Sequence, residues 1–132
     1  MKHSVLAFAA VVVPLLSSAV AAQGVRVERN ISLELAGQVA SAAVASCQAS
    51  GHQVTAAVVD RAGQLRALAR ADNAGPHTIE AARAKAFTSA SARSNTLAMM
   101  ENAQKNPAAA NLVHLPGFLL LGGGCRSVRA LT

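Results

Sequence analysis

The chain has few aromatic side chains: three phenylalanines, and no tryptophan or tyrosine, among 132 residues. Phe8 lies in an apolar segment near the start, which leaves Phe87 and Phe118 for the remainder. A core must therefore be built from alanine, valine and leucine, with close approach of the backbone. Nucleic-acid binding usually combines stacking aromatics with clustered Lys and Arg. The sequence has neither, so we expect no nucleic-acid partner.

Cysteine is also scarce, with only Cys47 and Cys125. No C-x-x-C motif occurs, so neither a zinc site of that kind nor a c-type haem attachment is indicated. Two cysteines in an oxidising compartment could form a disulfide. The helical pattern around Cys47, however, favours the role of a small buried hydrophobic residue.

Long apolar runs are limited to one, Val5–Leu16, which follows a basic start. It is shorter than the roughly 20 residues that a membrane-spanning helix needs. Small residues precede possible cleavage points at Ala21 and Ala22, as signal peptidase requires. Residues 1–22 are therefore predicted to be a signal peptide, with a short membrane anchor as the alternative. The mature protein would be periplasmic or secreted, with no stable membrane span.

Acidic residues are few, and the net charge is +6. Half of this excess comes from Lys2, Arg126 and Arg129, so the bias elsewhere is mild and suits a small anionic ligand. Asp60 and Asp72 are the only aspartates, and both fall in predicted turns. No nucleophile–histidine–acid set can be assembled with any preference. We therefore predict no catalytic residues, and a non-enzymatic role is favoured.

Residues 23–132 are predicted to form a single domain whose first half is a helix followed by a hairpin. The helix spans Leu33–Ser50, with Ser32 as its N-cap and the stripe Ala36, Val39, Ala40, Ala43, Val44 and Cys47 buried. Two strands, Val54–Val59 and Gln64–Ala71, flank the turn Asp60–Gly63. The glycine at the end of that turn predicts a hairpin with a bulge.

The second half is predicted to be mainly helical. A loop from Asp72 opens a helix at His77 or Thr78, whose buried stripe is Ile79, Ala82, Ala86 and Ala90. A short helix follows over Leu97–Ala103, and Phe118–Leu121 reads as an apolar strand before three glycines. His52 is expected on the surface and His114 half-buried. The fold class is therefore α+β, an antiparallel sheet packed with helices.

Three motifs at fixed spacing carry a family resemblance. They are V-V-D-x-x-G-x-L from Val58, R-x-D-x-A from Arg70, and H-T-x-E-A-A-R-x-K-A-F-T from His77. Together they resemble the GlcG/HbpS family of haem-binding proteins, also described as haem-degrading domains, over roughly Leu33 to Gly124. The resemblance implies a profilin-like or PAS-like sheet of about five strands, an oligomer, and a possible haem cofactor. Asn73 departs from the pattern, since the family usually has glycine there.

The ligand-binding residues that follow from this resemblance are His77, Thr78, Lys85, Arg70 and Asp72. Imidazole is a common axial ligand of haem iron, so His77 is the candidate iron ligand, with N-terminal capping as the alternative. The ammonium of Lys85 could meet a haem propionate or another carboxylate. A solvated surface lysine is the alternative for Lys85. Arg70 is either a solvated residue or pairs with Asp72 or Asp60 to shape the loop.

The tail after Gly124 does not follow the family pattern, which usually continues with a turn such as Leu-Pro-Val. Residues 125–132 show no helix or strand period. A one-base shift of reading frame at or near Gly124 is compatible with this difference, so the chain is predicted to be truncated or frameshifted there.

Three functions are compatible with these observations. The first is an exported haem-binding protein of the GlcG/HbpS type, in haem sensing, storage or detoxification. The second is an accessory protein or enzyme acting on a small carboxylic acid or diol metabolite. The third is a structural homo-oligomer without a ligand.

Overall fold

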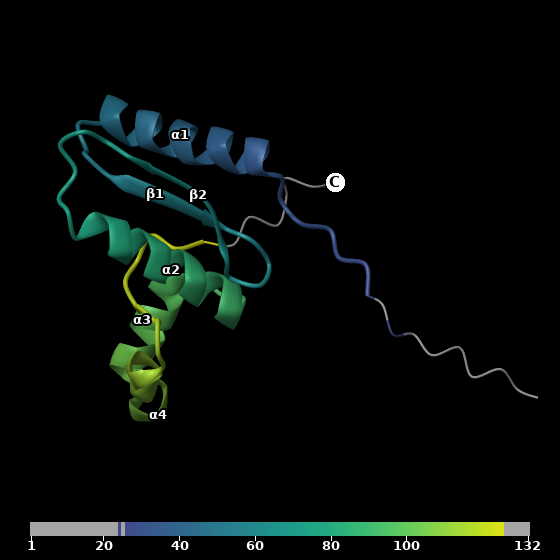
Figure 1. Cartoon of the computed structure of the whole chain (residues 1–132). Coiled ribbons are helices and arrows are strands. Elements are labelled where there is room, and N and C mark those ends of the chain that lie inside the picture. Colours follow the sequence, from purple (N-terminus) through teal and green to yellow (C-terminus); the bar gives the residue numbers. More distant parts are fainter. Residues whose placement is uncertain (1–23, 25, 126–132) are drawn as a thin grey trace, which may run out of the picture.

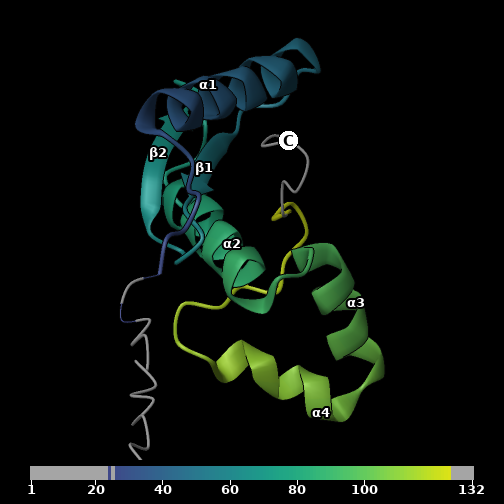
Figure 2. The same ribbon diagram turned by 90° about the vertical axis from the view of Figure 1, so that its right-hand side faces the viewer.

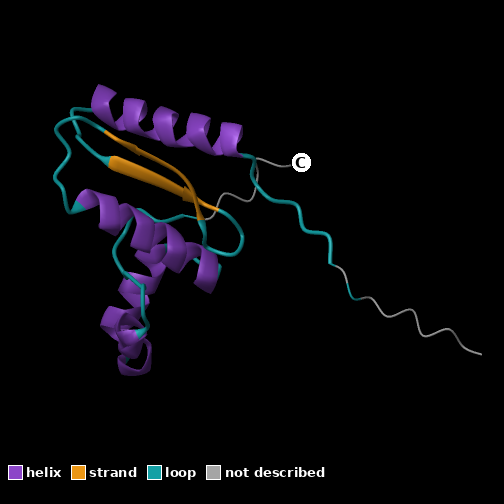
Figure 3. Cartoon of the chain, in the orientation of Figure 1, coloured by secondary structure: helices purple, strands orange, loops and turns teal. Residues whose placement is uncertain are grey.

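The computed structural model describes residues 24 and 26–125, and its fold class is the predicted α+β. The predictions about the signal peptide, its cleavage and the tail beyond residue 125 lie outside the described residues. The elements, shown by type in Figure 3, are α1 (Leu33–Ala49), β1 (Thr55–Val59), β2 (Leu65–Arg70), α2 (Thr78–Ala92), α3 (Thr96–Lys105), α4 (Pro107–Ala110) and the 3-10 helix η1 (Asn111–His114). None of the described helices is both long and apolar enough to cross a bilayer.

The hairpin β1–β2 lies between α1 and α2 (Figures 1 and 2). Helix α1 packs on both strands, and α2 packs on β1. A small core of alanine and valine joins these layers, with Val44, Ala71 and Ala74 buried against Val54, Ala56 and Ala69. Such small side chains let the helices approach the strands closely, as the shortage of aromatics requires.

Helix α1 begins as predicted, since the Ser32 hydroxyl accepts a hydrogen bond from the backbone N–H of Leu35 at 3.2 Å. Its buried residues are Ala36, Ala40 and Val44. The prediction that Val39 and Ala43 are also buried is wrong, because both are exposed. Two strands form a narrow surface, and a narrow surface covers only the i, i+4 stripe of the helix above it.

The hairpin turn has the predicted chemistry. The Asp60 carboxylate accepts from the backbone N–H groups of Ala62 and Gln64, both at 2.9 Å. Gly63 has a φ of 80°, a conformation that favours glycine. The register shifts at the turn end of β1, which confirms the bulge. These contacts are local in sequence, and this explains why the sequence predicted them.

Arg93 is the C-cap residue of helix α2, and its φ of 54° places a residue other than glycine in the left-handed conformation. This conformation costs an L-residue roughly 1–2 kcal/mol, a cost that glycine avoids. Replacing Arg93 with glycine would remove this cost, but the larger backbone entropy of glycine in the unfolded chain would offset part of the stabilisation. Arg93→Gly is therefore expected to raise the free energy of unfolding by about 0.5–1 kcal/mol. Urea denaturation checks this, and a lower free energy of unfolding for the variant would contradict it.

The segment Phe118–Leu121 is not the strand that the sequence predicted. It is extended but has no place in a strand ladder, and the described residues form a sheet of only two strands. A side chain holds its backbone instead: the Leu119 N–H donates to the hydroxyl of Thr88 in α2 at 2.8 Å. Helices α4 and η1 were not predicted, and α3 extends to Lys105, beyond its expected end at Ala103.

Candidate functional site

Three of the five predicted ligand-binding residues line one hollow between the start of β1 and α2. His77, Thr78 and Lys85 come from α2 and its N-cap. The hollow has a volume of about 200 Å³, and its other lining residues are Gln53, Val54, Thr55, Ala81, Ala82 and Leu121. One wall is therefore the first turns of a helix, another is the beginning of a strand, and a third is the apolar segment before the glycines.

Two threonine hydroxyls join the strand to the helix at this hollow. The Thr78 hydroxyl donates to the carbonyl of Gly75 at 2.6 Å. It lies 2.7 Å from the hydroxyl of Thr55. Since the single hydroxyl proton of Thr78 is directed to Gly75, Thr55 is the donor in the second bond. The pair ties β1 to α2 and presents polar groups beside an otherwise apolar strand.

His77 occupies the N-cap position of α2, but its side chain makes no capping hydrogen bond. Its ring packs on Gly75, where a Cβ atom would lie 2.7 Å from the imidazole Cε1. The glycine is therefore needed for the ring to take this position. Because the imidazole is exposed and does not cap the helix, it remains accessible to a ligand.

Lys85 lies further along α2 and is half-buried rather than a solvated surface lysine. Its Nζ donates to the carbonyl of Gly122 at 3.2 Å. A Cβ at Gly123 would lie 3.0 Å from the same nitrogen, so the glycine segment wraps closely around the ammonium. An ammonium has three donors. Among the described residues Gly122 takes one, which leaves donors for an acidic ligand.

The family model described as "Haem degrading protein HbpS-like" matches residues 31–127. The chain belongs to this HbpS-like family. No curated protein matches it.

Solved structures agree with this assignment. The crystal structure of HbpS is 35% identical, with 79% of this chain and 72% of that chain covered and a TM-score of 0.73. A double mutant of HbpS from Streptomyces reticuli is 32% identical, with 89% and 80% covered and the same TM-score of 0.73. Protein ORFY of Klebsiella pneumoniae is 22% identical, with 80% and 74% covered and a TM-score of 0.70, and it shows the fold alone.

Arg70 and Asp72, the other two predicted ligand-binding residues of this HbpS-like chain, do not line the hollow. The Arg70 guanidinium donates to the carbonyl of Ala74 through Nε, at 3.1 Å, and through Nη2. The predicted ion pair of Arg70 with Asp72 or Asp60 is wrong for the described residues, because a backbone carbonyl takes its place. Arg70 thus closes the loop that leads to His77, and Asp72 is exposed.

The remaining histidines lie elsewhere in the HbpS-like fold. His52 is exposed, as expected, and His114 is exposed although it was predicted to be half-buried. His114 is the last residue of a 3-10 helix that the sequence did not predict. The described residues contain no group of three His, Cys, Asp or Glu side chains suited to a metal ion. Among the residues that the structure describes, an iron would therefore have fewer than three such ligands, as a haem iron can.

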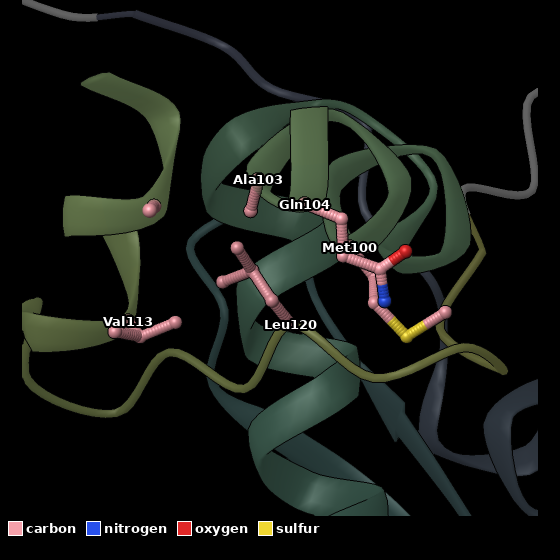
Figure 4. Close-up of a pocket in the computed structure, with 6 residues that line it drawn as sticks. Met100, Ala103, Gln104, Val113 and Leu120 are labelled. Carbon is pink, nitrogen blue, oxygen red and sulfur yellow. The ribbon is translucent and has the colours of Figure 1, made fainter. Parts of the chain in front are cut away.

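A second hollow of about 320 Å³ lies where α3 and α4 face the extended segment (Figure 4). Its lining residues are Met100, Ala103, Gln104, Ala110, Val113 and Leu120. None of these side chains carries a charge, so nothing in this lining would recognise an acid. Its lining includes none of the predicted ligand-binding residues. The first hollow is therefore the candidate site of the HbpS-like chain.

Sequence reasoning missed the β1 side of this site. Thr55 and Leu121 reach the hollow from segments far from α2 in the sequence. The only signal for Thr55 was a hydroxyl residue among alanines and valines in a predicted strand. The only signal for Leu121 was its place in an apolar run.

Proposed function

We propose that this protein binds haem outside the cytoplasm, in sensing, storage or detoxification, through the hollow between β1 and α2. One observation carries the proposal: His77, Thr78 and Lys85, selected from the sequence, line the same hollow. An imidazole supplies an axial ligand to haem iron, and an ammonium pairs with a propionate. The membership in a family described by haem degradation supports the choice of ligand.

The size of the hollow determines how haem would fit. Sites that enclose a drug-sized ligand have volumes of about 300–1,000 Å³, whereas this one has about 200 Å³. It therefore suits an acidic edge of haem rather than the whole macrocycle. Lys85 would hold the propionate and Thr78 would add a hydroxyl. The ring of His77, which is exposed, would be available to the part of the ligand that stays outside the hollow.

The same volume favours a second candidate, a small free carboxylic acid. Such an acid needs a cation and a hydroxyl but no iron ligand. The two candidates share the carboxylate–Lys85 contact and differ in their need for His77. Variants at these two positions therefore distinguish them.

A haem titration followed by absorbance tests the proposal. The Soret band is expected to shift and saturate, and His77→Ala is expected to weaken binding by about tenfold or more, equivalent to about 1.4 kcal/mol. Lys85→Gln removes a charged hydrogen bond worth about 1.5–3 kcal/mol and is expected to weaken binding similarly. His114→Ala is the matched control, since His114 is exposed and lies outside the hollow.

Circular dichroism accompanies each titration, so that a loss of binding is read only from folded protein. A folded protein whose Soret band does not shift would rule out haem binding. Equal effects of His77→Ala and His114→Ala would rule out His77 as the iron ligand. Saturable binding of a small acid that depends on Lys85 but not on His77 would select the second candidate.

A further inference from the structure

The residues before α1 form an extended arm, Arg26–Asn30, that leaves the body of the molecule (Figure 1). All five side chains are exposed, and Val27 is 92% exposed. Arg26 and Glu28 form an ion pair at 3.2 Å, so alternate side chains lie on one side, as they do on a strand. Asn30 anchors the base of the arm, because its Oδ1 accepts from the Arg61 N–H at 3.2 Å.

The backbone of this arm is available for pairing. From Arg26 to Arg29, no backbone N–H or C=O group bonds to another described residue. The sequence alternates valine with charged residues, V-R-V-E-R from position 25. Alternation of this kind is typical of a strand with one buried face. The arm thus has the sequence pattern of a strand, is extended (Figure 1), and has no partner within the described part of its own chain.

Among the described residues, β1 pairs only with β2, which leaves its other edge without a partner strand. The Ala71 N–H donates to the Val54 carbonyl, so these two residues are a hydrogen-bonded pair. Bonded and non-bonded pairs alternate in an antiparallel ladder. The pair Ala57–Leu68 is therefore non-bonded, and the N–H and C=O of Ala57 are directed away from β2. No bond from these groups to any other described segment is formed.

Composition distinguishes this edge from that of β2. Strand β1 reads T-A-A-V-V and carries no charge, whereas β2 contains Arg66 and Arg70. Charged side chains protect an edge from pairing, and an uncharged edge lacks this protection. The arm itself contains Arg26 and Arg29, which the arginines of β2 would repel. The favoured partner of the arm is therefore the β1 edge.

We propose that the arm Arg26–Asn30 of one copy adds as a strand to the open β1 edge of a second copy. The arm and β1 are of equal length. The exchange would bury Val27, which is the most exposed large apolar residue in the described part of the chain. A symmetric pair would place each arm on the other copy and close both edges. This proposal does not depend on haem binding.

Proline substitutions in the arm test the exchange in the purified protein. Successive N–H groups of a strand point to opposite sides, and proline removes one of them. Only one of Val27→Pro and Glu28→Pro is therefore expected to convert the assembly to monomer, and each is the control for the other. Size-exclusion chromatography with light scattering measures the mass. A monomeric wild-type protein, or two variants that assemble like wild type, would overturn the proposal.

A complementary variant tests the edge. Ala57→Pro removes an N–H that the hairpin does not use, so β1–β2 is expected to persist while the edge is blocked. Labelled Ala57→Pro, which retains its arm, is then expected to bind the arm-defective proline variant, which retains its edge. Fluorescence anisotropy of the mixture measures this, and no binding between two folded variants would overturn the proposal. If Ala57→Pro does not fold, the arm variants still decide the question.

Discussion

Replacing Gly124 with alanine is expected to lower the free energy of unfolding by about 3 kcal/mol, the upper part of the range for overpacking. A Cβ at this position would lie 2.6 Å from the backbone oxygen of Lys85 and 2.8 Å from Cγ2 of Thr96. The first atom is in the middle of a helix, and the second belongs to a fully buried side chain. Neither can move without displacing α2 or the start of α3.

Hydrogen bonds are a second reason why Gly124 cannot be replaced without a loss of stability. The Gly124 N–H donates to the Thr96 hydroxyl at 2.8 Å, and the Thr96 N–H donates to the Gly124 carbonyl at 3.0 Å. A displaced Gly124 would leave these buried groups without partners, which costs about 1–3 kcal/mol for each group. The glycine segment also carries the carbonyl bonded to Lys85, so the hollow is expected to change as well.

Gly37→Ala is the matched control for Gly124→Ala. Gly37 lies inside α1, and a Cβ there would meet nothing within 4 Å. Alanine in a helix is favoured over glycine by about 0.5–1 kcal/mol. Urea denaturation is therefore expected to show opposite shifts for the two variants. A free energy of unfolding for Gly124→Ala within 0.5 kcal/mol of wild type would show that the glycine segment is not packed as described.

The first half of the fold followed from the sequence because its signals are local. Ser32 caps α1 through a residue three positions away. Asp60 and Gly63 close a turn whose bonds span at most four positions. Interactions between residues so close in sequence depend only on a short segment of the chain. The residue types in that segment were therefore sufficient to predict them.

The buried face of α2 did not follow in the same way. The predicted apolar stripe is half-buried, whereas the most buried residues are Thr88 and Ser89. Their hydroxyls bond to Leu119 and Ser94, respectively, and Thr88 also donates to Ala84. A hydroxyl can be buried once it is bonded. Leu119, however, is 31 positions from Thr88, and a hydrophobic pattern cannot reveal a partner so far away.

The candidate site was predicted only in part, because some of its residues come from segments that are far apart in the sequence. His77, Thr78 and Lys85 share one helix and its cap, so helical geometry alone brings them to one side. Thr55 reaches them only through the packing of β1 on α2. A role for Arg70 in shaping the loop was one of two predicted alternatives, the other being a solvated residue. Arg70 is exposed and bonds to the carbonyl of Ala74, and a backbone carbonyl leaves no signal in a sequence. The sequence could indicate only an ion pair with an aspartate, whereas the observed partner of Arg70 is the backbone carbonyl of Ala74.

Phe87→Ala is expected to lower the free energy of unfolding by about 3 kcal/mol, the lower end for a phenylalanine because this ring is half-buried. The ring fills the space beside two glycines with φ near 80°: a Cβ at Gly63 would lie 2.8 Å from it, and a Cβ at Gly117 would lie 3.3 Å from it. It also meets Phe118 edge to face, with ring centroids 6.1 Å apart. Phe87 therefore joins the hairpin turn, α2 and the extended segment.

Two comparisons make the Phe87 result decisive. Phe87→Leu keeps most of the apolar volume and is expected to cost less than about 1.5 kcal/mol. Leu115→Ala removes an apolar side chain that is 45% exposed, and it is expected to stay within about 0.5 kcal/mol of wild type. Denaturant midpoints at constant slope measure all three variants. If Phe87→Ala destabilised the protein no more than Leu115→Ala, the ring would not be what holds these three segments together. The close approach of Gly63 and Gly117 to the Phe87 ring would then need another explanation.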